Sequence, residues 1–367
     1  MKILIFSWRG PGHPNSGGAE ISTHEHAKGW VKNGCEVTLF TSSYPTAKSE
    51  EVVDGVKIIR RGRQVLGVHL EAFKWYLFNK HDRFDLVVDQ FHGIPFFTPF
   101  FIWKKKIGFI HEVTREVWKL NPWSKPFNLI PAILGTLFEP LIFIFYRNTP
   151  FMTVSESTRD DLVSWGIPKE NIRVIHNGIR SMKVKTKRET KKTLIYLGAI
   201  SKDKGVEDVI EVFSQIPKKE DFQFWIVGKS DTKYLGELKQ KCKELGIENK
   251  VKFWGYVDER NKFELLSKAY LLINPSIREG WGLVVIEAAS VGTPTIGYNV
   301  AGLKDSVKNG ETGILCEPNP EACTKAVLSL DETKYQTLRK NCLNWSKNFD
   351  WDKSSKQSLE LIKSLLI

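Results

Sequence analysis

The sequence predicts an α/β protein with two doubly wound domains that face each other across a cleft. Segments apolar enough for buried strands alternate with segments of helical period along the whole chain, a pattern typical of parallel sheets covered by helices on both faces. The 367 residues exceed what one hydrophobic core usually serves, so two domains are expected. Glycine-rich turns follow two of the expected strands, as they do at ligand sites of such sheets.

The composition is that of a globular protein, with 41% hydrophobic and 26% charged residues. The five cysteines are scattered, odd in number and without a Cys-x-x-Cys pair, which indicates reduced thiols, a cytoplasmic location and no zinc site. The segment Met1–Trp8 has an apolar run shorter than the core of a signal peptide, and it leads into a glycine-rich turn. We therefore predict that it forms a buried first strand.

Short apolar segments between turn residues mark the expected strands. They are Lys2–Ser7, Glu36–Thr41, Leu86–Asp89, Ile107–Ile110, Phe151–Val154, Arg173–Ile175, Thr193–Leu197, Gln223–Val227, Val251–Trp254, Leu271–Asn274 and Thr295–Gly297. Helical stretches separate most of them, so two parallel sheets would use them all.

The domain boundary is expected near residue 178. The segment His176-Asn-Gly-Ile179 is followed by the charged stretch 180–192, which has no apolar period and is typical of a linker. We therefore expect an N-terminal domain over residues 1–178, a C-terminal domain over residues 179–345, and a closing helical segment over residues 346–367.

The most informative segment contains two glutamates eight positions apart, around a glycine turn and a helix start. Glu279 lies on the predicted loop, and Glu287 lies on the predicted helix. Gly280 and Gly282 allow the backbone to come close to a ligand. This arrangement is typical of a sugar-nucleotide pocket, although a lone pair of surface glutamates would more often be only solvated charges.

Two helix starts in the C-terminal half offer N–H groups to an anion. One helix is predicted from about Leu283 to a glycine stop at Gly292, and the N–H groups of its first turn have no partner within the helix. The other follows Lys204, which stands close enough to neutralise a diphosphate. Taken alone, Lys204 is as well explained as a solvated lysine.

The N-terminal half contains two weaker candidates. Gly17 and Gly18 lie in a turn between the first strand and a helix, a natural anion cradle, although glycine pairs usually mark only a turn. His111 follows a strand at the carboxyl end, where ligands of open α/β sheets bind, although a strand-end histidine is commonly a surface group.

Together these features resemble retaining glycosyltransferase family 4, the group 1 glycosyltransferases, whose members have a GT-B-type fold of two Rossmann-like domains. The Glu-x7-Glu pair, the Gly-Gly-Ala-Glu loop ending at Glu20, the strand-end histidine and the His-Asn-Gly-Ile segment carry the resemblance, which is strongest over residues 251–315. It implies an acceptor-side N-terminal domain, a C-terminal domain that binds the nucleotide sugar, and a closing helix that packs back on the N-terminal domain.

The resemblance also implies roles for single residues. Glu279 and His111 would position the transferred sugar, Lys204 would neutralise the diphosphate, and Glu287 would hold the ribose hydroxyls. The other residues implied in donor binding are Gly17, Gly18, Tyr256, Val257, Gly280, Trp281, Gly282 and Leu283. The implied reaction is retaining, metal-independent transfer of a hexose-type sugar from a UDP- or GDP-linked donor to an acceptor hydroxyl, without a cofactor.

One position departs from the family pattern and keeps other interpretations open. The family usually has an arginine straight after the first glycine of the second domain, where this chain has Ala199. Lys202 or Arg278 would then have to supply the second cation. A non-catalytic protein that binds sugar nucleotides, or a GT-B-type epimerase that converts the donor alone, are the alternatives to a transferase.

Residues 73–151 are enriched in aromatic side chains about twofold over the whole chain. The apolar run 129–146 is interrupted by prolines and Glu139, so a transmembrane helix is not expected. Two interpretations stay open: peripheral contact with an anionic membrane through residues 103–146, or a buried helix pair. The first suits the net charge of +12, a location at the inner face of the membrane, and an acceptor that is lipid-linked or a glycan precursor. No nucleic-acid-reading motif accompanies the charge.

Overall fold

The computed structural model of the protein describes residues 1–81, 83–91, 93–120, 129–180, 182, 184, 189, 191–217 and 221–367. The chain forms two compact units, of which the first contains Met1–Gly178 and Asp350–Ile367 and the second contains Ile179–Phe349. The first unit is built on an eight-stranded sheet and the second on a six-stranded sheet. Both sheets are largely parallel and covered by helices, which confirms the predicted α/β class.

The sheet of the first unit has the order β3-β4-β2-β1-β5-β6-β7-β8. Its strands are β1 (Lys2–Phe6), β2 (Glu36–Thr41), β3 (Glu50–Val53), β4 (Val56–Arg60), β5 (Leu86–Phe91), β6 (Lys105–Ile110), β7 (Phe151–Thr153) and β8 (Ile172–Val174). All neighbouring strands are parallel except β3 and β4, which form an antiparallel hairpin at one edge.

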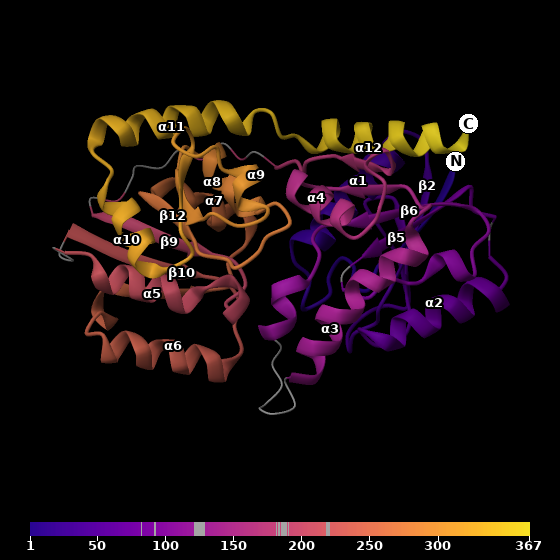
Figure 1. Cartoon of the computed structure of the whole chain (residues 1–367), viewed down its shortest axis with the longest axis horizontal. Coiled ribbons are helices and arrows are strands. Elements are labelled where there is room, and N and C mark those ends of the chain that lie inside the picture. The colour runs from indigo at the N-terminus through magenta and orange to yellow at the C-terminus, as the bar shows by residue number, and fades with distance from the viewer. Residues whose placement is uncertain are drawn as a thin grey trace. The chain divides into compact units, whose positions relative to one another are not determined.

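Helices cover both faces of this sheet (Figure 1). They are α1 (Gly18–Lys32), α2 (Leu66–Phe78), α3 (Leu129–Ile142), α4 (Glu156–Ser164) and α12 (Trp351–Leu366), with short 3-10 helices η1 (Thr98–Phe100), η2 (Arg115–Leu120), η3 (Phe143–Tyr146) and η4 (Lys169–Asn171). Successive strand residues point to opposite faces, so Val87 and Phe91 of β5 point to the same face. Buried side chains of α2 pack in one cluster with Val87, and buried side chains of η3 pack in another with Phe91. Both helices therefore cover this face.

The opposite face is covered by α1 and the C-terminal helix α12. The hydroxyl of Ser358 accepts a hydrogen bond from Nε1 of Trp30 over 2.8 Å and lies 2.9 Å from Nδ1 of His26. Burial lowers the pKa of His26 to about 3, so its ring is neutral near pH 7. These contacts attach the end of the chain to the first unit, as Figure 1 shows for α12 along α1.

A buried carboxylate holds two connections against the sheet of the first unit. Asp89 of β5 accepts hydrogen bonds from the hydroxyls of Tyr146 over 2.5 Å and Thr98 over 2.8 Å, and from the backbone N–H of Phe96 over 3.0 Å. Burial raises the pKa of Asp89, and the hydrogen bonds oppose this shift. The network ties η1 and η3 to the centre of the sheet.

The sheet of the second unit has the order β11-β10-β9-β12-β13-β14, with all strands parallel. Its strands are β9 (Lys192–Leu197), β10 (Phe222–Val227), β11 (Val251–Gly255), β12 (Leu271–Asn274), β13 (Thr295–Tyr298) and β14 (Gly313–Cys316). The chain winds outward from β9 to one edge and then from β12 to the other. Ligands of such doubly wound sheets bind at the switch point, here between β9 and β12.

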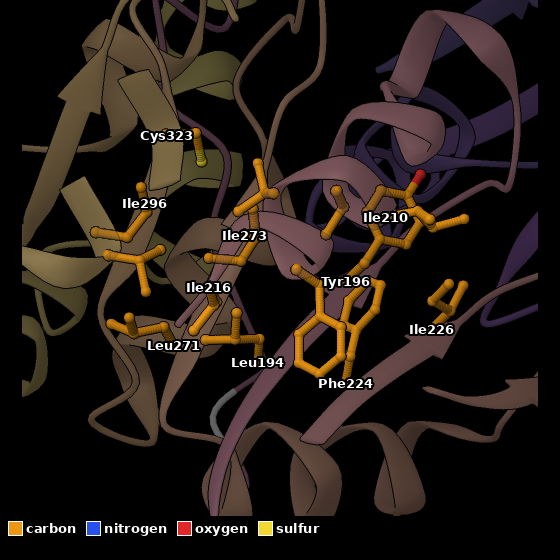
Figure 2. Close-up of a cluster of buried hydrophobic side chains, with 14 of the residues drawn as sticks. Leu194, Tyr196, Ile210, Ile216, Phe224, Ile226, Leu271, Ile273, Ile296 and Cys323 are labelled. Atoms are coloured by element: carbon orange, nitrogen blue, oxygen red, sulfur yellow. The ribbon is translucent and has the colours of Figure 1, made fainter. Parts of the chain in front are cut away.

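Helices enclose the second sheet and bury its aliphatic side chains. They are α5 (Val206–Gln215), α6 (Thr232–Glu244), α7 (Glu259–Lys268), α8 (Leu283–Ser290), α9 (Leu303–Ser306), α10 (Pro320–Leu328) and α11 (Glu332–Ser346), with 3-10 helices η5 (Lys202–Lys204) and η7 (Glu248–Lys250). Figure 2 shows part of this core, where Leu194, Phe224 and Ile273 of three strands pack beside Ile210 of α5. All four side chains are fully buried.

The predicted strands are all present, within two residues at most boundaries. The hairpin of β3 and β4 and the strand β14 are additional. The hairpin is detectable in the sequence, because Asp54-Gly55 between Val53 and Val56 is a common two-residue turn. Its antiparallel edge corrects the expectation of purely parallel sheets. Residues 181, 183, 185–188 and 190 of the predicted linker lie outside the described residues.

The interpretation of the apolar run as part of a buried helix pair is wrong for residues 129–146. Only 17% of the stretch Leu129–Tyr146 is buried, and Glu139 is the buried residue of α3. The apolar residues of this stretch therefore form the exposed face of a surface helix. Residues 121–128 of the proposed membrane-contact segment lie outside the described residues.

Candidate functional site

Two loops of the second unit bring Lys204 and Glu279 together at the switch point. Lys204 ends η5, which follows β9, and Glu279 lies in the loop after the neighbouring strand β12. The Lys204 ammonium donates to Oε1 of Glu279 over 2.9 Å, and the Ser276 hydroxyl donates to the same oxygen over 2.7 Å. The two charged side chains are 23% and 17% exposed, so a ligand can reach the pair.

Two glycines allow these loops to approach each other. Gly205 has a φ of 68°, and a Cβ at this position would collide with the carbonyl oxygen of Pro275. Gly302 has a φ of 78°, and a Cβ there would collide with the carbonyl oxygen of Glu279. L-residues rarely adopt this conformation, and a side chain would also collide with the facing carbonyl oxygen, so both positions require glycine. The backbone of Glu279 is thereby held between the loops that follow β9 and β13.

The two cations considered as substitutes for the missing arginine lie in different surroundings. The Arg278 side chain is 7% exposed, and its carbonyl oxygen accepts a hydrogen bond from Lys204 over 3.5 Å. Lys202 begins η5 and is exposed. The carbonyl oxygen of Ala199 accepts a hydrogen bond from the Tyr196 hydroxyl over 2.5 Å, so this loop is ordered without an arginine.

The loop after Glu279 leads into α8 as predicted. Gly282 is the N-cap, Leu283 is the first helical residue, and Gly292 follows the end of the helix. The indole of Trp281 is 2% exposed and packs on Phe349, with ring centroids 5.2 Å apart. The Trp281 side chain therefore supports the loop from inside, and only the backbone of this segment is available to an anion.

Glu287 forms a buried ion pair with Lys262 of α7, which sequence analysis did not identify. The Lys262 ammonium donates to Oε1 of Glu287 over 2.6 Å and also to Oε1 of Glu259 over 2.8 Å. Burial raises the pKa of Glu287, and the positive charge of Lys262 opposes that shift. Burial alone would lower the pKa of Lys262, but the two carboxylates raise it, so the lysine is charged. No short motif links positions 262 and 287, because packing of α7 on α8 creates the pair.

Tyr256 and Val257 follow β11 at its carboxyl end and lead into α7. The ring of Tyr256 is 70% exposed, and the Lys229 ammonium lies 4.6 Å from its centroid. Val257 is partly buried against the core beneath α7 and α8. Lys262 lies in the first turn of the same helix. The helix that begins after the Tyr256 loop therefore also holds the carboxylate of Glu287.

In the first unit, the glycine turn is held by an internal carboxylate. Gly17 is the N-cap of α1, and its N–H donates to Oε2 of Glu20 over 2.6 Å. Nε of Arg9 donates to the other oxygen of Glu20 over 2.9 Å. The Gly17 N–H is therefore used within the loop. The first-turn N–H groups at Gly18 and Ala19 lack acceptors within the helix, as at any helix start, so they are the groups that could meet an anion.

His111 lies at the carboxyl end of β6, beside α1. Its Nε2 lies 3.5 Å from the hydroxyl of Thr23, which is on the second turn of α1, and its carbonyl oxygen accepts a hydrogen bond from Thr158 over 3.1 Å. The ring packs on Phe109 with centroids 4.3 Å apart and is 5% exposed. His111 is thus positioned by three elements close to the start of α1.

The predicted site residues fall into two groups. Lys204, Glu279 and Glu287 lie in the second unit, together with the loops that contain Tyr256 and Gly280. His111 and the Gly17-Gly18 turn lie in the first unit. Within each unit, the predicted residues lie at the carboxyl ends of parallel strands, where backbone N–H groups, cations and carboxylates can bind a charged ligand. Among the described residues, no group of three or more His, Cys, Asp or Glu side chains is arranged to hold a metal ion.

Two protein-family models match consecutive parts of the chain. Residues 16–181 match the model described as Glycosyltransferase Family 4, and residues 179–349 match the model described as Glycosyl transferases group 1. The two matches meet at the boundary between the compact units and together include the predicted site residues.

Relatives and solved structures show the same similarity. An uncharacterized glycosyltransferase of Methanocaldococcus jannaschii is 25% identical over 403 residues, which cover 99% of this chain and 98% of that protein. N-acetyl-alpha-D-glucosaminyl L-malate synthase of Bacillus anthracis is 37% identical over 129 residues, 35% of this chain and 33% of that protein.

Sucrose-phosphate synthase from Thermosynechococcus elongatus has a similar fold, with a TM-score of 0.80 at 21% identity over 99% of this chain and 98% of that one. Anabaena HepE in complex with UDP and glucose has a TM-score of 0.76 at 19% identity over 99% of this chain and 100% of that one. The solved structures establish the GT-B fold, and the family models cover both halves. The chain is a glycosyltransferase and belongs to the group 1 glycosyltransferases.

Proposed function

We propose that the protein transfers a hexose from a nucleoside-diphosphate sugar to an acceptor hydroxyl, with retention of the anomeric configuration and without a metal ion. The observation that carries the proposal is the ion pair of Lys204 and Glu279 at the switch point between β9 and β12. The UDP and glucose bound to Anabaena HepE, which has the same fold, support a UDP- rather than a GDP-linked donor. The acceptor is a lipid-linked sugar or another glycan precursor.

Catalysis would depend mainly on fixed charges. As the bond from C1 of the sugar to the diphosphate breaks, a bond from C1 to the acceptor oxygen forms on the same face, and the acceptor proton passes to the departing diphosphate. Negative charge grows on the diphosphate and positive charge on the sugar ring. Lys204 and the first-turn N–H groups of α8 stabilise the diphosphate, with Gly18 of α1 adding a further N–H group. Glu279 and His111 position the sugar.

The nucleoside part of the donor would bind along α7 and α8. Glu287 accepts hydrogen bonds from the ribose hydroxyls, and the backbone at Tyr256 and Val257 contacts the base. Lys262 holds the Glu287 carboxylate in its ionised form and in one orientation, because a buried carboxylate without a cation tends to take up a proton. Lys262 is therefore a positioning residue for the ribose.

Replacing Lys262 by methionine is expected to weaken nucleoside-diphosphate binding about tenfold near neutral pH, because Glu287 loses its charge partner. The loss should become smaller as the pH rises. Burial raises the pKa of Glu287, so a higher pH restores the carboxylate that Lys262 had maintained. Calorimetric titration at several pH values measures this effect. Lys262→Arg keeps the charge and serves as the control, and a pH-independent loss in Lys262→Met would contradict the positioning role.

Nucleoside-diphosphate release from a panel of UDP-, GDP- and ADP-sugars, in the presence of EDTA and with or without a lipid extract, tests the proposed reaction. We expect release from one UDP-sugar, unchanged by EDTA and increased by the extract. Analysis of the product by NMR then shows whether the anomeric configuration is retained. Donor binding without release would favour a non-catalytic protein, in line with Ala199. Conversion of the donor alone into an isomer would favour an epimerase.

A further inference from the structure

Two helices on one face of the first sheet present apolar side chains to solvent. On α3 and η3 these side chains are 48–62% exposed, and along α2 they follow the helical spacing i, i+4, i+7, i+11. The set, which we call the apolar layer, consists of Leu66, Leu70, Phe73 and Leu77 of α2 and Leu129, Ile130, Ile133, Leu134, Leu137, Phe138, Leu141, Ile144 and Phe145 of α3 and η3.

The two parts of the apolar layer are connected by ring contacts. Both helices cover the same sheet face, and ring contacts connect them through η1. Phe73 of α2 packs on Phe101 with centroids 5.1 Å apart, and Phe100 packs on Phe145 of η3 with centroids 4.9 Å apart. Single apolar residues scattered over a surface are common, but apolar residues grouped on neighbouring elements mark an interaction surface.

The carboxylate of Glu139 points away from the apolar layer. Glu139 is the charged residue of α3, and its side chain points away from solvent. Its Oε1 accepts a hydrogen bond from the N–H of Thr114 over 2.6 Å, and its Oε2 accepts from the N–H of Arg115 over 2.9 Å and from Nε1 of Trp118 over 2.8 Å. The outer face of α3 is thus left without charge, and α3 is attached to the loop that follows His111.

Basic residues lie at the amino ends of the strands that the apolar layer covers. In a parallel sheet each connection returns the chain to the amino end of the next strand, so the residues just before β5, β6 and β7 share one edge. Exposed cations gather there, and among the described residues none of them forms an ion pair. We call this set the basic edge: Lys80, Arg83, Lys104, Lys105 and Arg147.

An open cavity of about 810 Å³ lies at this edge, between the amino ends of β6 and β7. Lys104 and Lys105 line it together with Asp85 and with Leu365 and Leu366 at the end of α12. Trp103, which is 86% exposed and follows η1, also lines the cavity. Trp and Lys side chains of this kind favour the headgroup layer of a bilayer, where one end of the side chain is apolar and the other is wet.

By length and composition alone, Leu129–Tyr146 could cross a bilayer, with a mean hydropathy of 1.9. The α-helical part, α3, has 14 residues, which corresponds to about 21 Å at 1.5 Å per residue, short of the roughly 30 Å of a hydrocarbon core. The inward hydrogen bonds of Glu139 also hold α3 against η2. This geometry suits a helix that lies in the plane of the interface.

We propose that the apolar layer and the basic edge together form a docking surface for a bilayer that contains anionic phospholipid. The leucine and phenylalanine side chains enter the acyl boundary, and the basic edge binds the phosphate-bearing headgroups. Charge complementarity identifies the occupant: a second copy of this chain, with its net charge of +12, would bring the same cations to the interface. The surface goes beyond the proposed transfer and does not depend on it.

Flotation of the full-length protein with vesicles, without sugar nucleotide, tests the proposal. The wild type is expected to float with vesicles of phosphatidylcholine and phosphatidylglycerol. The variant Leu134→Gln/Leu137→Gln/Leu141→Gln is expected to partition at least about tenfold less, because it loses apolar area that would be buried in the interface. The matched control Leu328→Gln/Leu343→Gln changes leucines of the second unit that are 49% and 42% exposed, and it should float as the wild type does.

The basic edge has its own variant and control. Lys104→Gln/Lys105→Gln is expected to weaken binding to the mixed vesicles about fivefold per lysine and to leave binding to phosphatidylcholine alone unchanged. Lys334→Gln/Lys340→Gln changes two exposed lysines on α11 and should have no such effect. Equal losses in this control would contradict a defined basic edge.

The proposal is overturned if the wild type does not float, or if the leucine variant floats equally well. It is also overturned if the wild type does not bind vesicles and light scattering shows that it is a dimer, whereas the leucine variant is a monomer. A second copy of the chain would then cover the apolar layer. Circular dichroism checks that each variant is folded, and Leu66→Gln/Leu70→Gln on α2 gives a second test should the α3 variant misfold. Because flotation needs no donor, an inactive protein that floats would contradict only the proposed transfer.

Discussion

Replacing Glu279 by alanine is expected to lower sugar transfer by about 10²- to 10³-fold while the protein stays folded. The carboxylate has two tasks in the proposed reaction: it faces the sugar, and it holds the Lys204 ammonium at 2.9 Å. Glu279→Gln keeps an oxygen for the Ser276 hydroxyl but removes the charge, so we expect it to recover only a small part of the activity. Steady-state release of nucleoside diphosphate from the preferred donor measures both variants.

A second ion pair of the same unit provides the control for Glu279. Glu211 of α5 accepts a hydrogen bond from the Lys241 ammonium over 2.5 Å, and neither residue belongs to the candidate site. Glu211→Ala should leave transfer close to that of the wild type. A thermal unfolding midpoint similar to that of the wild type shows that Glu279→Ala is folded. Near-normal transfer by Glu279→Ala would contradict the assignment of the site.

Replacing Lys204 by alanine is expected to depress transfer by a similar factor and to weaken nucleoside-diphosphate binding by a smaller one. In the proposed reaction Lys204 stabilises the leaving group, whose charge is greatest in the transition state, so its removal should lower kcat more than it raises KM. Calorimetry with the nucleoside diphosphate and steady-state kinetics with the donor separate the two effects. Lys241→Ala is the matched control, and equal losses in binding and turnover would contradict this role.

The double variant tests whether Lys204 and Glu279 act as a unit. Residues that share one interaction show strongly non-additive effects. We therefore expect Glu279→Ala/Lys204→Ala to be no slower than the slower single variant by more than about threefold. A loss equal to the product of the two single losses would show that the residues act independently.

The sequence alone was sufficient for the strands and for the local geometry of the glycine loops. Buried parallel strands have apolar runs bounded by turn residues, and a helix start after glycines has its own signature, so the strand β12, the loop at Glu279 and the helix from Leu283 could all be predicted. The hairpin turn at Asp54 has an equally local signature, the Asp-Gly pair. These features depend on residues close together in the chain.

Contacts between distant residues could not be predicted in this way. Lys262 and Glu287 meet because α7 packs on α8, and Glu139 turns inward because Thr114, Arg115 and Trp118 lie beside it. Periodicity shows that a helix has an apolar face, but not whether that face is covered. The exposure of α3 was therefore one of two open interpretations until the structure was known.

The sequence by itself determined the fold class, because buried parallel strands have apolar runs separated by helical stretches, and its short glycine- and glutamate-containing motifs carry the resemblance to the family. The tertiary structure alone decided which charges are paired and which apolar surfaces are left uncovered. The physical reason is that burial and ion pairing depend on distances between side chains that are far apart in the chain, such as those of Lys204 and Glu279, and strand order and loop packing set those distances.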